Sequence, residues 1–100
     1  KGEFMNLLLI ISHKNYEAFL CPFISQLVKR GIQFQCFFTG EGVLNLEQSE
    51  LIDLLKKSSS SVVCHQSWQK FFNETSSPIN EGSQTNLSEM IADQVKVVSL

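Results

Sequence analysis

The sequence lacks several features that would assign a function directly. Its longest uninterrupted apolar run is Leu7 to Ile11, much shorter than the roughly 20 residues that a membrane-spanning helix needs. No basic segment followed by an apolar one resembles a signal peptide. The eight Lys and Arg residues are scattered and the formal net charge is -2, so the sequence contains no basic stripe that would bind nucleic acid. These absences predict a cytoplasmic protein that contacts neither a membrane nor nucleic acid directly.

Cysteine is also scarce, and its pattern excludes a disulfide framework and a metal site. The chain has three cysteines without regular spacing or a Cys-x-x-Cys pair, which fits a reducing compartment. Zinc sites take about four Cys, His or carboxylate ligands at chelating spacings, which Cys64-His65 does not supply. The segment Thr39 to Gly42 has two glycines, but neither the third glycine of a dinucleotide loop nor the Lys-Ser/Thr of a phosphate loop. We therefore expect no metal and no cofactor.

Apolar blocks recur along the chain at spacings typical of alternating strands and helices. With 100 residues and 43% hydrophobic content, the chain suits one domain over residues 5–100, with residues 1–4 an expression-derived extension. Strands are expected at 6–12, 32–39, 61–64 and 95–100, with a short edge strand near Ile79 inside a polar loop over 73–85. This alternation predicts an α/β domain.

The helices are less sharply bounded by the sequence. The first ends at about Gly31, and Pro22 leaves two starts open: near Cys21, or at Asn15 with a kink. The later helices are expected as follows: one over 51–55 capped by Asn45 or Ser49, one beginning near Ser67, and one opened by an Asn86 and Glu89 capping box. Together the elements predict a three-layer αβα fold, flavodoxin-like, with a mostly parallel sheet of four to five strands.

Chemistry-bearing residues gather where the first three strands end. Ligands of such sheets collect beyond the carboxyl ends of the strands, and a strand order of 2-1-3 would place these loops side by side. The candidate residues in these loops are His13, Tyr16, Glu41, Cys64, His65 and Ser67. The clustering depends on the strand order, which the sequence does not fix.

Cys64 is the cysteine whose position in the sequence favours a reactive thiol. It lies between an apolar strand and a helix, where backbone N–H groups and the helix dipole favour the reactive thiolate. The alternative is a small buried hydrophobe that ends a strand. His65 and His13 are candidates for tuning its protonation, although a surface histidine is an equally good interpretation of His65. Cys21 and Cys36 fall in apolar segments and are expected in the core.

Three segments carry a resemblance to a known family. An aromatic pair leads into a Thr-Gly-Glu-Gly-Val turn at 37–43, Val62-Val63-Cys64 ends the third strand, and Ala-Asp-x-Val falls at 92–95. In their order and spacing over nearly all of residues 5–100 they resemble the DsrE/DsrF-like family, in particular sulfur-relay subunits of the TusD and DsrE type. The resemblance implies a small α/β protein in an oligomer, such as a trimer or hexamer, homomeric or mixed.

The resemblance also implies a role for the third-strand cysteine. Members carry sulfur as a persulfide on the cysteine after strand three, which maps to Cys64, and exchange it with persulfide donor and acceptor proteins. The expected function is thus sulfurtransferase-like carriage, with Tyr16, Glu41 and Ser67 lining the pocket. The alternatives are a non-catalytic interaction subunit, which would use the surplus of aromatic side chains, and a thiol redox sensor, for which no resolving cysteine is evident.

Overall fold

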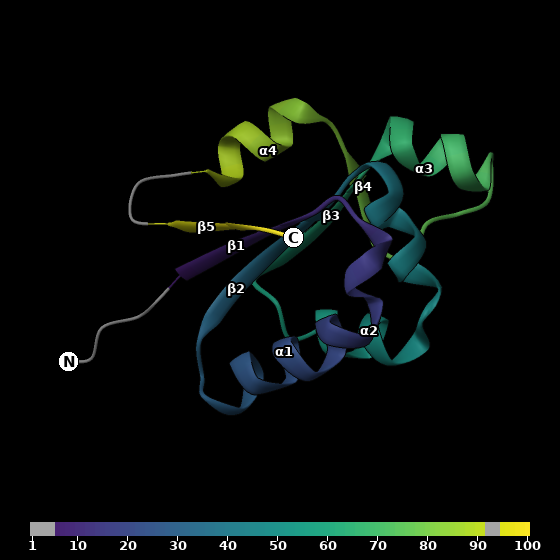
Figure 1. The fold of residues 1–100 in the computed structure, drawn as a ribbon. Coiled ribbons are helices and arrows are strands. Elements are labelled where there is room, and N and C mark those ends of the chain that lie inside the picture. Colours follow the sequence, from purple (N-terminus) through teal and green to yellow (C-terminus); the bar gives the residue numbers. More distant parts are fainter. Residues whose placement is uncertain (1–5, 92–94) are drawn as a thin grey trace.

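The computed structural model describes residues 6–91 and 95–100, so the 1–4 extension and part of the 92–95 ending lie outside the described residues. It contains one sheet flanked by helices (Figure 1). In chain order the elements are β1 (Asn6–Ile11), η1 (Lys14–Tyr16), α1 (Glu17–Lys29), β2 (Gln33–Phe38), η2 (Gly40–Glu47), α2 (Ser49–Leu55), β3 (Ser60–Cys64), α3 (His65–Phe72), β4 (Asn80–Gly82), α4 (Gln84–Met90) and β5 (Lys96–Ser99). The elements η1 and η2 are 3₁₀ helices, which follow β1 and β2 respectively.

The five strands form one all-parallel sheet in the order β4-β3-β2-β1-β5. This confirms the expected α/β fold with a flavodoxin-like parallel sheet. The strand order 2-1-3, on which the predicted clustering depended, is wrong. The crossovers through α1 and α2 each advance the chain by one strand in the same direction, so β2 lies between β1 and β3. The end of β2, not that of β1, is therefore the neighbour of Cys64.

The two faces of the sheet are covered unequally. Because side chains alternate along a strand, Leu7, Leu9 and Ile11 enter a large core cluster that also takes in buried residues of α1, η2 and α2. The opposite face carries a small cluster of Leu8, Phe37, Val62, Cys64 and Met90 beneath α4. In Figure 1, α1 and α2 lie on one side of the sheet and α4 on the other. Cys64 belongs to the thinly covered face.

The start of α1 is decided in favour of the earlier alternative. The helix begins at Glu17 and contains Pro22, whose exposed ring costs the helix one backbone hydrogen bond without ending it. The expected caps of α2 are wrong, because Gln48 occupies the N-cap position while Asn45 is buried in η2. Here η2 fills a segment that the sequence analysis treated as a simple break after the strand.

The boundaries of the last two helices also differ from expectation. α3 begins at His65, so Cys64 is its N-cap and Ser67 lies in its first turn instead of capping it. α4 is opened by a capping box between Ser83 and Asn86, one turn before the predicted Asn86 cap. The expected edge strand near Ile79 is confirmed as β4.

The aromatic residues mostly fill the core. Phe37, Phe38 and Trp68 are buried, and Trp68 stacks on Phe72 and donates its Nε1 hydrogen to the Thr75 carbonyl. Among the described residues, the large hydrophobic side chains that are exposed are Phe19, Ile91 and Val97. Within the described part of the chain, no helix has the length and apolar character needed to cross a membrane.

Candidate functional site

Cys64 is the last residue of β3 and the N-cap of α3. An N-cap side chain lies beside the backbone N–H groups of the second and third helical residues, which here are Gln66 and Ser67. The thiol makes no formal cap hydrogen bond, yet both amides act on its sulfur. The residue is 7% exposed, so the sulfur lies just beneath the surface. The strand-to-helix junction therefore presents Cys64 to donors that prefer an anion.

Two hydroxyl groups approach the same sulfur. Thr39 follows β2, whose last residue, Phe38, is in register with Val63, so Thr39 comes level with Cys64 on the neighbouring strand. The Thr39 and Ser67 hydroxyl oxygens lie 3.4 Å apart, and both hydroxyls act to lower the pKa of Cys64. The strand order thus brings a residue of β2 to the site.

The Ser67 hydroxyl is held by the turn that follows β2. The Gly40 N–H donates to Ser67 Oγ over 2.8 Å. Gly40 has a φ of +55°, which favours glycine, and it turns the chain into η2. With an N–H occupying one lone pair of Ser67 Oγ, its single proton can be donated to Thr39 or to the Cys64 sulfur. The turn therefore orients Ser67 as a donor.

Close packing fixes this turn against the end of β1. A Cβ atom on Gly42 would lie 2.0 Å from the Ile11 carbonyl oxygen, so only glycine allows η2 to pack there. The buried Asn45 side chain donates from Nδ2 to the carbonyls of His13 and Gly42, at 3.1 and 3.0 Å. The segment from Thr39 to Gly42, in which the sequence showed no ligand-binding motif, supports the Thr39 and Ser67 hydroxyls.

The electrostatics of the site favour the thiolate. Burial raises the pKa of the Cys64 thiol, but the Ser67 hydroxyl, the Ser67 and Gln66 amides and the Thr39 hydroxyl together bring its pKa below the ordinary value. All four groups bind the charged sulfur better than the neutral one. These donors therefore favour the thiolate of Cys64 more than water favours that of an ordinary cysteine.

A pocket of about 380 Å³ opens beside Cys64. Its lining residues are Cys64, His65, Gln66, Gly82, Ser83, Gln84 and Thr85. Gly82 pairs with Cys64 across β3 and β4, and a Cβ there would lie 2.7 Å from Val62 Cγ1 and from Asn86 Oδ1. Because Gly82 has no side chain, the α4 capping box can form one wall of the pocket. Cys64 remains in contact with the interior of the pocket.

The structure places one of the two predicted histidines, His65, in the lining of the Cys64 pocket. His65 Nδ1 pairs with Glu81 Oε1 at 2.5 Å, so the ring engages β4. His13 follows β1, and its ring lies beside the Ser12 hydroxyl at 3.2 Å. Neither His13 nor the exposed Glu41 is among the described residues that line the Cys64 pocket. The Tyr16 side chain lies outside the described residues.

Of the residues predicted from the sequence, Ser67 lies beside Cys64, although it is not among the described residues that line the pocket, and Thr39 is a neighbour that the sequence did not identify. Thr39 was recognised as a strand end and not as a site residue, because its approach depends on β2 lying next to β3. Gln66 contributes through its backbone, and the wall formed by 82–85 comes from the end of the segment predicted as a polar loop. The register of Cys64 with Gly82 is the feature that brings this wall to the thiol.

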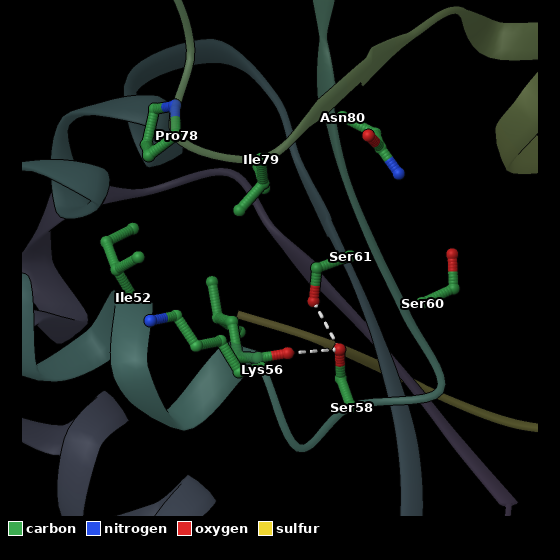
Figure 2. Close-up of a pocket in the computed structure, with 9 residues that line it drawn as sticks. Ile52, Lys56, Ser58, Ser60, Ser61, Pro78, Ile79 and Asn80 are labelled. Atoms are coloured by element: carbon green, nitrogen blue, oxygen red, sulfur yellow. Dashed lines mark hydrogen bonds between the residues drawn. The ribbon is translucent and has the colours of Figure 1, made fainter.

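A second pocket lies at the opposite end of β3 (Figure 2). It measures about 250 Å³ and places Lys56 near several serines. Ser58 donates to the Leu55 carbonyl and lies 2.6 Å from the Ser61 hydroxyl, as the dashed lines of Figure 2 indicate. Because these hydroxyls are already satisfied by each other and by the end of α2, they close a turn and offer little to a ligand.

No family model, curated protein or solved structure matched the chain in comparisons with known proteins. Its resemblance to the DsrE/DsrF-like family therefore stays an interpretation of the sequence. Among the described residues, no group of three or more His, Cys, Asp or Glu side chains is arranged to hold a metal ion. The chemistry of the site has to be argued from Cys64 and its surroundings.

Proposed function

We propose that this chain is a sulfur carrier that accepts sulfane sulfur as a persulfide on Cys64 and passes it to another thiol. The observation that carries the proposal is the position of Cys64 at the N-cap of α3, where two hydroxyls and two helix amides around its sulfur favour the thiolate. The sequence resemblance to sulfur-relay subunits supports the same role. The thiol beside an accessible pocket has what persulfide exchange requires.

The transfer balances without an external oxidant or reductant. The Cys64 thiolate attacks the outer sulfur of a donor persulfide, R–S–SH, and forms a new S–S bond as the donor S–S bond breaks. The products are Cys64–S–SH and the thiolate R–S⁻, so the sulfane sulfur changes carrier with no net redox change. The acceptor step is the same exchange, with the acceptor thiolate attacking the outer sulfur on Cys64.

The surroundings of Cys64 favour carriage over a disulfide-based redox sensor. Cys21 and Cys36 belong to the large core cluster, on the other side of the sheet from Cys64. All three cysteines are unpaired, and neither of the others stands on the face where Cys64 could use it as a resolving thiol. A persulfide carrier needs only one sulfur that a small donor or a partner thiol can reach.

The assembly and location of the carrier are part of the proposal. Exposed Val97 on edge strand β5 and exposed Ile91 after α4 support an oligomer, as the family resemblance implies. Three unpaired thiols suit the reducing cytoplasm. A persulfide donor supplies the sulfur, and an acceptor protein receives it.

The test is persulfide loading followed by peptide mapping. The full chain is incubated with a persulfide donor, and the added sulfur is located by mass spectrometry. We expect one added sulfur atom on the peptide containing Cys64, no loading of Cys64→Ser, and normal loading of the matched variant Cys21→Ser. Loading that persists in Cys64→Ser would refute the proposal, and a wild-type Cys64 no more reactive than an ordinary thiol would favour the interaction subunit.

A further inference from the structure

The pocket beside Cys64 limits which persulfides can reach the sulfur. Cys64 is 7% exposed and belongs to the cluster that includes Met90 of α4, so its sulfur is recessed. The 82–85 segment stands on one side of the pocket and the first turn of α3 on the other. Sulfur exchange needs the two reacting sulfurs at about 3–3.5 Å. A donor sulfur must therefore enter between these walls, which a small molecule can do more readily than a cysteine fixed on the surface of a folded protein.

The volume of the pocket suits a small molecule. At about 380 Å³ it falls near the lower end of the roughly 300–1,000 Å³ range of small-ligand sites. Gly82, without a side chain, stands opposite Cys64 in register and keeps the space beside the sulfur open. The pocket can thus hold a thiol compound of amino-acid or short-peptide size with its sulfur next to Cys64.

The charge of the lining selects among sulfur donors. Gln66, Ser83, Gln84 and Thr85 are neutral and polar, and no lysine or arginine is among the described residues that line the pocket. His65, the one lining residue that can carry a positive charge, pairs with the Glu81 carboxylate. A dianion such as thiosulfate would lose its hydration without gaining a cationic partner. A neutral or zwitterionic thiol can instead hydrogen-bond to the amides and hydroxyls.

We infer that the sulfur donor of Cys64 is the persulfide of a neutral or zwitterionic low-molecular-weight thiol, bound in the pocket between α3 and the 82–85 segment. This inference rests on the proposed persulfide role of Cys64. Cys64–S⁻ attacks the outer sulfur of the bound R–S–SH, the donor S–S bond breaks, and R–S⁻ leaves through the pocket mouth. The thiolate is oriented by Ser67 and Thr39, and the pocket supplies the position of the donor.

The test compares three donors on the full-length chain: cysteine persulfide, thiosulfate, and a folded protein carrying one persulfidated surface cysteine. Sulfur on Cys64 is followed over time by mass spectrometry. We expect cysteine persulfide to load Cys64 at least about tenfold faster than either other donor. It is small enough for the pocket, and unlike thiosulfate it is not a dianion that needs a cationic partner. Equal or faster loading from the protein donor would overturn the inference and leave the carrier function intact, and equal loading from thiosulfate would overturn the charge selection. Loading of Cys64 by none of the three would overturn the carrier function itself.

A substitution that fills the pocket separates binding from thiol chemistry. Gln84 is exposed at the start of α4, and Gln84→Trp places an indole over the pocket without removing any group that contacts the Cys64 sulfur. We expect about tenfold slower loading from cysteine persulfide, with an unchanged pH midpoint of thiolate ultraviolet absorbance. The matched control is Gln26→Trp on the exposed side of α1, which should load normally.

A competition measurement on the unaltered protein guards against misfolding of the variant. S-methylcysteine has the size and charge of the inferred donor but no sulfur to transfer. We expect saturating S-methylcysteine to slow both cysteine persulfide loading and iodoacetamide alkylation of Cys64. Loading that is insensitive to S-methylcysteine and to Gln84→Trp would overturn the pocket as the donor site.

Discussion

Cys36 and Cys64 lie on neighbouring strands of one sheet and face opposite sides of it. Cys36 belongs to the large core cluster and is 0% exposed, and burial raises its pKa far above the ordinary value. Cys64 belongs to the small cluster, and helix amides and hydroxyls bring its pKa below the ordinary value although it is also mostly buried. The difference comes both from the deeper burial of the Cys36 sulfur and from the larger set of hydrogen-bond donors around the Cys64 sulfur.

A serine hydroxyl lies beside each of the two cysteines, Ser61 at Cys36 and Ser67 at Cys64. The Ser61 hydroxyl acts to lower the pKa of the Cys36 thiol, but burial raises that pKa by more, so it stays above the ordinary value. Ser67 beside Cys64 accepts from the Gly40 N–H and keeps its proton available. A serine hydroxyl thus favours the thiolate at both cysteines, and the outcome differs because Cys36 is more deeply buried and Cys64 also has amide donors.

The largest expected effect is the difference in reactivity between the two cysteines. With iodoacetamide at neutral pH and native fold, we expect Cys64 to alkylate at least about a thousandfold faster than Cys36, which must wait for local opening of the core. Peptide mapping over time gives both rates. Comparable rates in the folded protein would break the comparison, and alkylation of both in urea provides the control.

The second prediction concerns the unequal cover of the two faces. Leu51 is 0% exposed in the large core and Met90 is 9% exposed over the small one. We expect Leu51→Ala to lower the free energy of unfolding by about 4 kcal/mol and Met90→Ala by about 2 kcal/mol, measured by urea denaturation. Only Met90→Ala should also speed Cys64 alkylation in the folded state, because it loosens α4. Equal acceleration by both variants would mean that global unfolding exposes Cys64.

The third prediction tests the donors around the thiolate. Ser67→Ala removes a donor and should raise the Cys64 pKa, so less thiolate is present below that pKa and alkylation near neutral pH slows by about threefold to tenfold. Thr39→Val should have a smaller effect in the same direction. Because the thiol is fully ionised above both pKa values, the rates of wild type and variants should converge at alkaline pH. Ser88→Ala, on the exposed side of α4, is the control, and an unshifted pH profile for Ser67→Ala would contradict the role of its hydroxyl.

The smallest expected effect is that of the histidine next to Cys64. The His65 side chain is 54% exposed and pairs with Glu81, so we expect His65→Ala to change the alkylation rate of Cys64 by less than about twofold. Glu81→Gln, which removes the carboxylate partner, is the matched variant. A large fall in rate for His65→Ala alone would restore the role in tuning that the sequence suggested.

Much of the fold could be predicted because its signals are local. The apolar run of β1, the helical spacing before Gly31 and the polar loop before β4 each reflect short-range periodicity, and the structure contains these elements. The missed features depend on longer-range contacts. Asn45 reads as a helix cap in sequence but lies buried in η2, where its Nδ2 holds the His13 and Gly42 carbonyls together.

The candidate site divides in the same way. That Cys64 ends a strand and precedes a helix follows from the change of periodicity around it, and this placed the thiol near helix amides. That Thr39 approaches Cys64 and His13 does not follows only from the strand order. Strand order depends on the direction in which each crossover packs on the sheet, which no short stretch of sequence encodes.

By itself, then, the sequence determined the succession of strands and helices, the junction at Cys64 and the exclusion of Cys21 and Cys36 from exposed chemistry, because periodicity and residue type act over a few neighbours. The tertiary structure alone decided which hydroxyls contact the Cys64 sulfur, that His65 turns to Glu81, and that Gly82 leaves a pocket beside the thiol. These contacts join residues from β2, β3, β4 and α3, and their positions are set by parallel pairing and packing of the whole sheet.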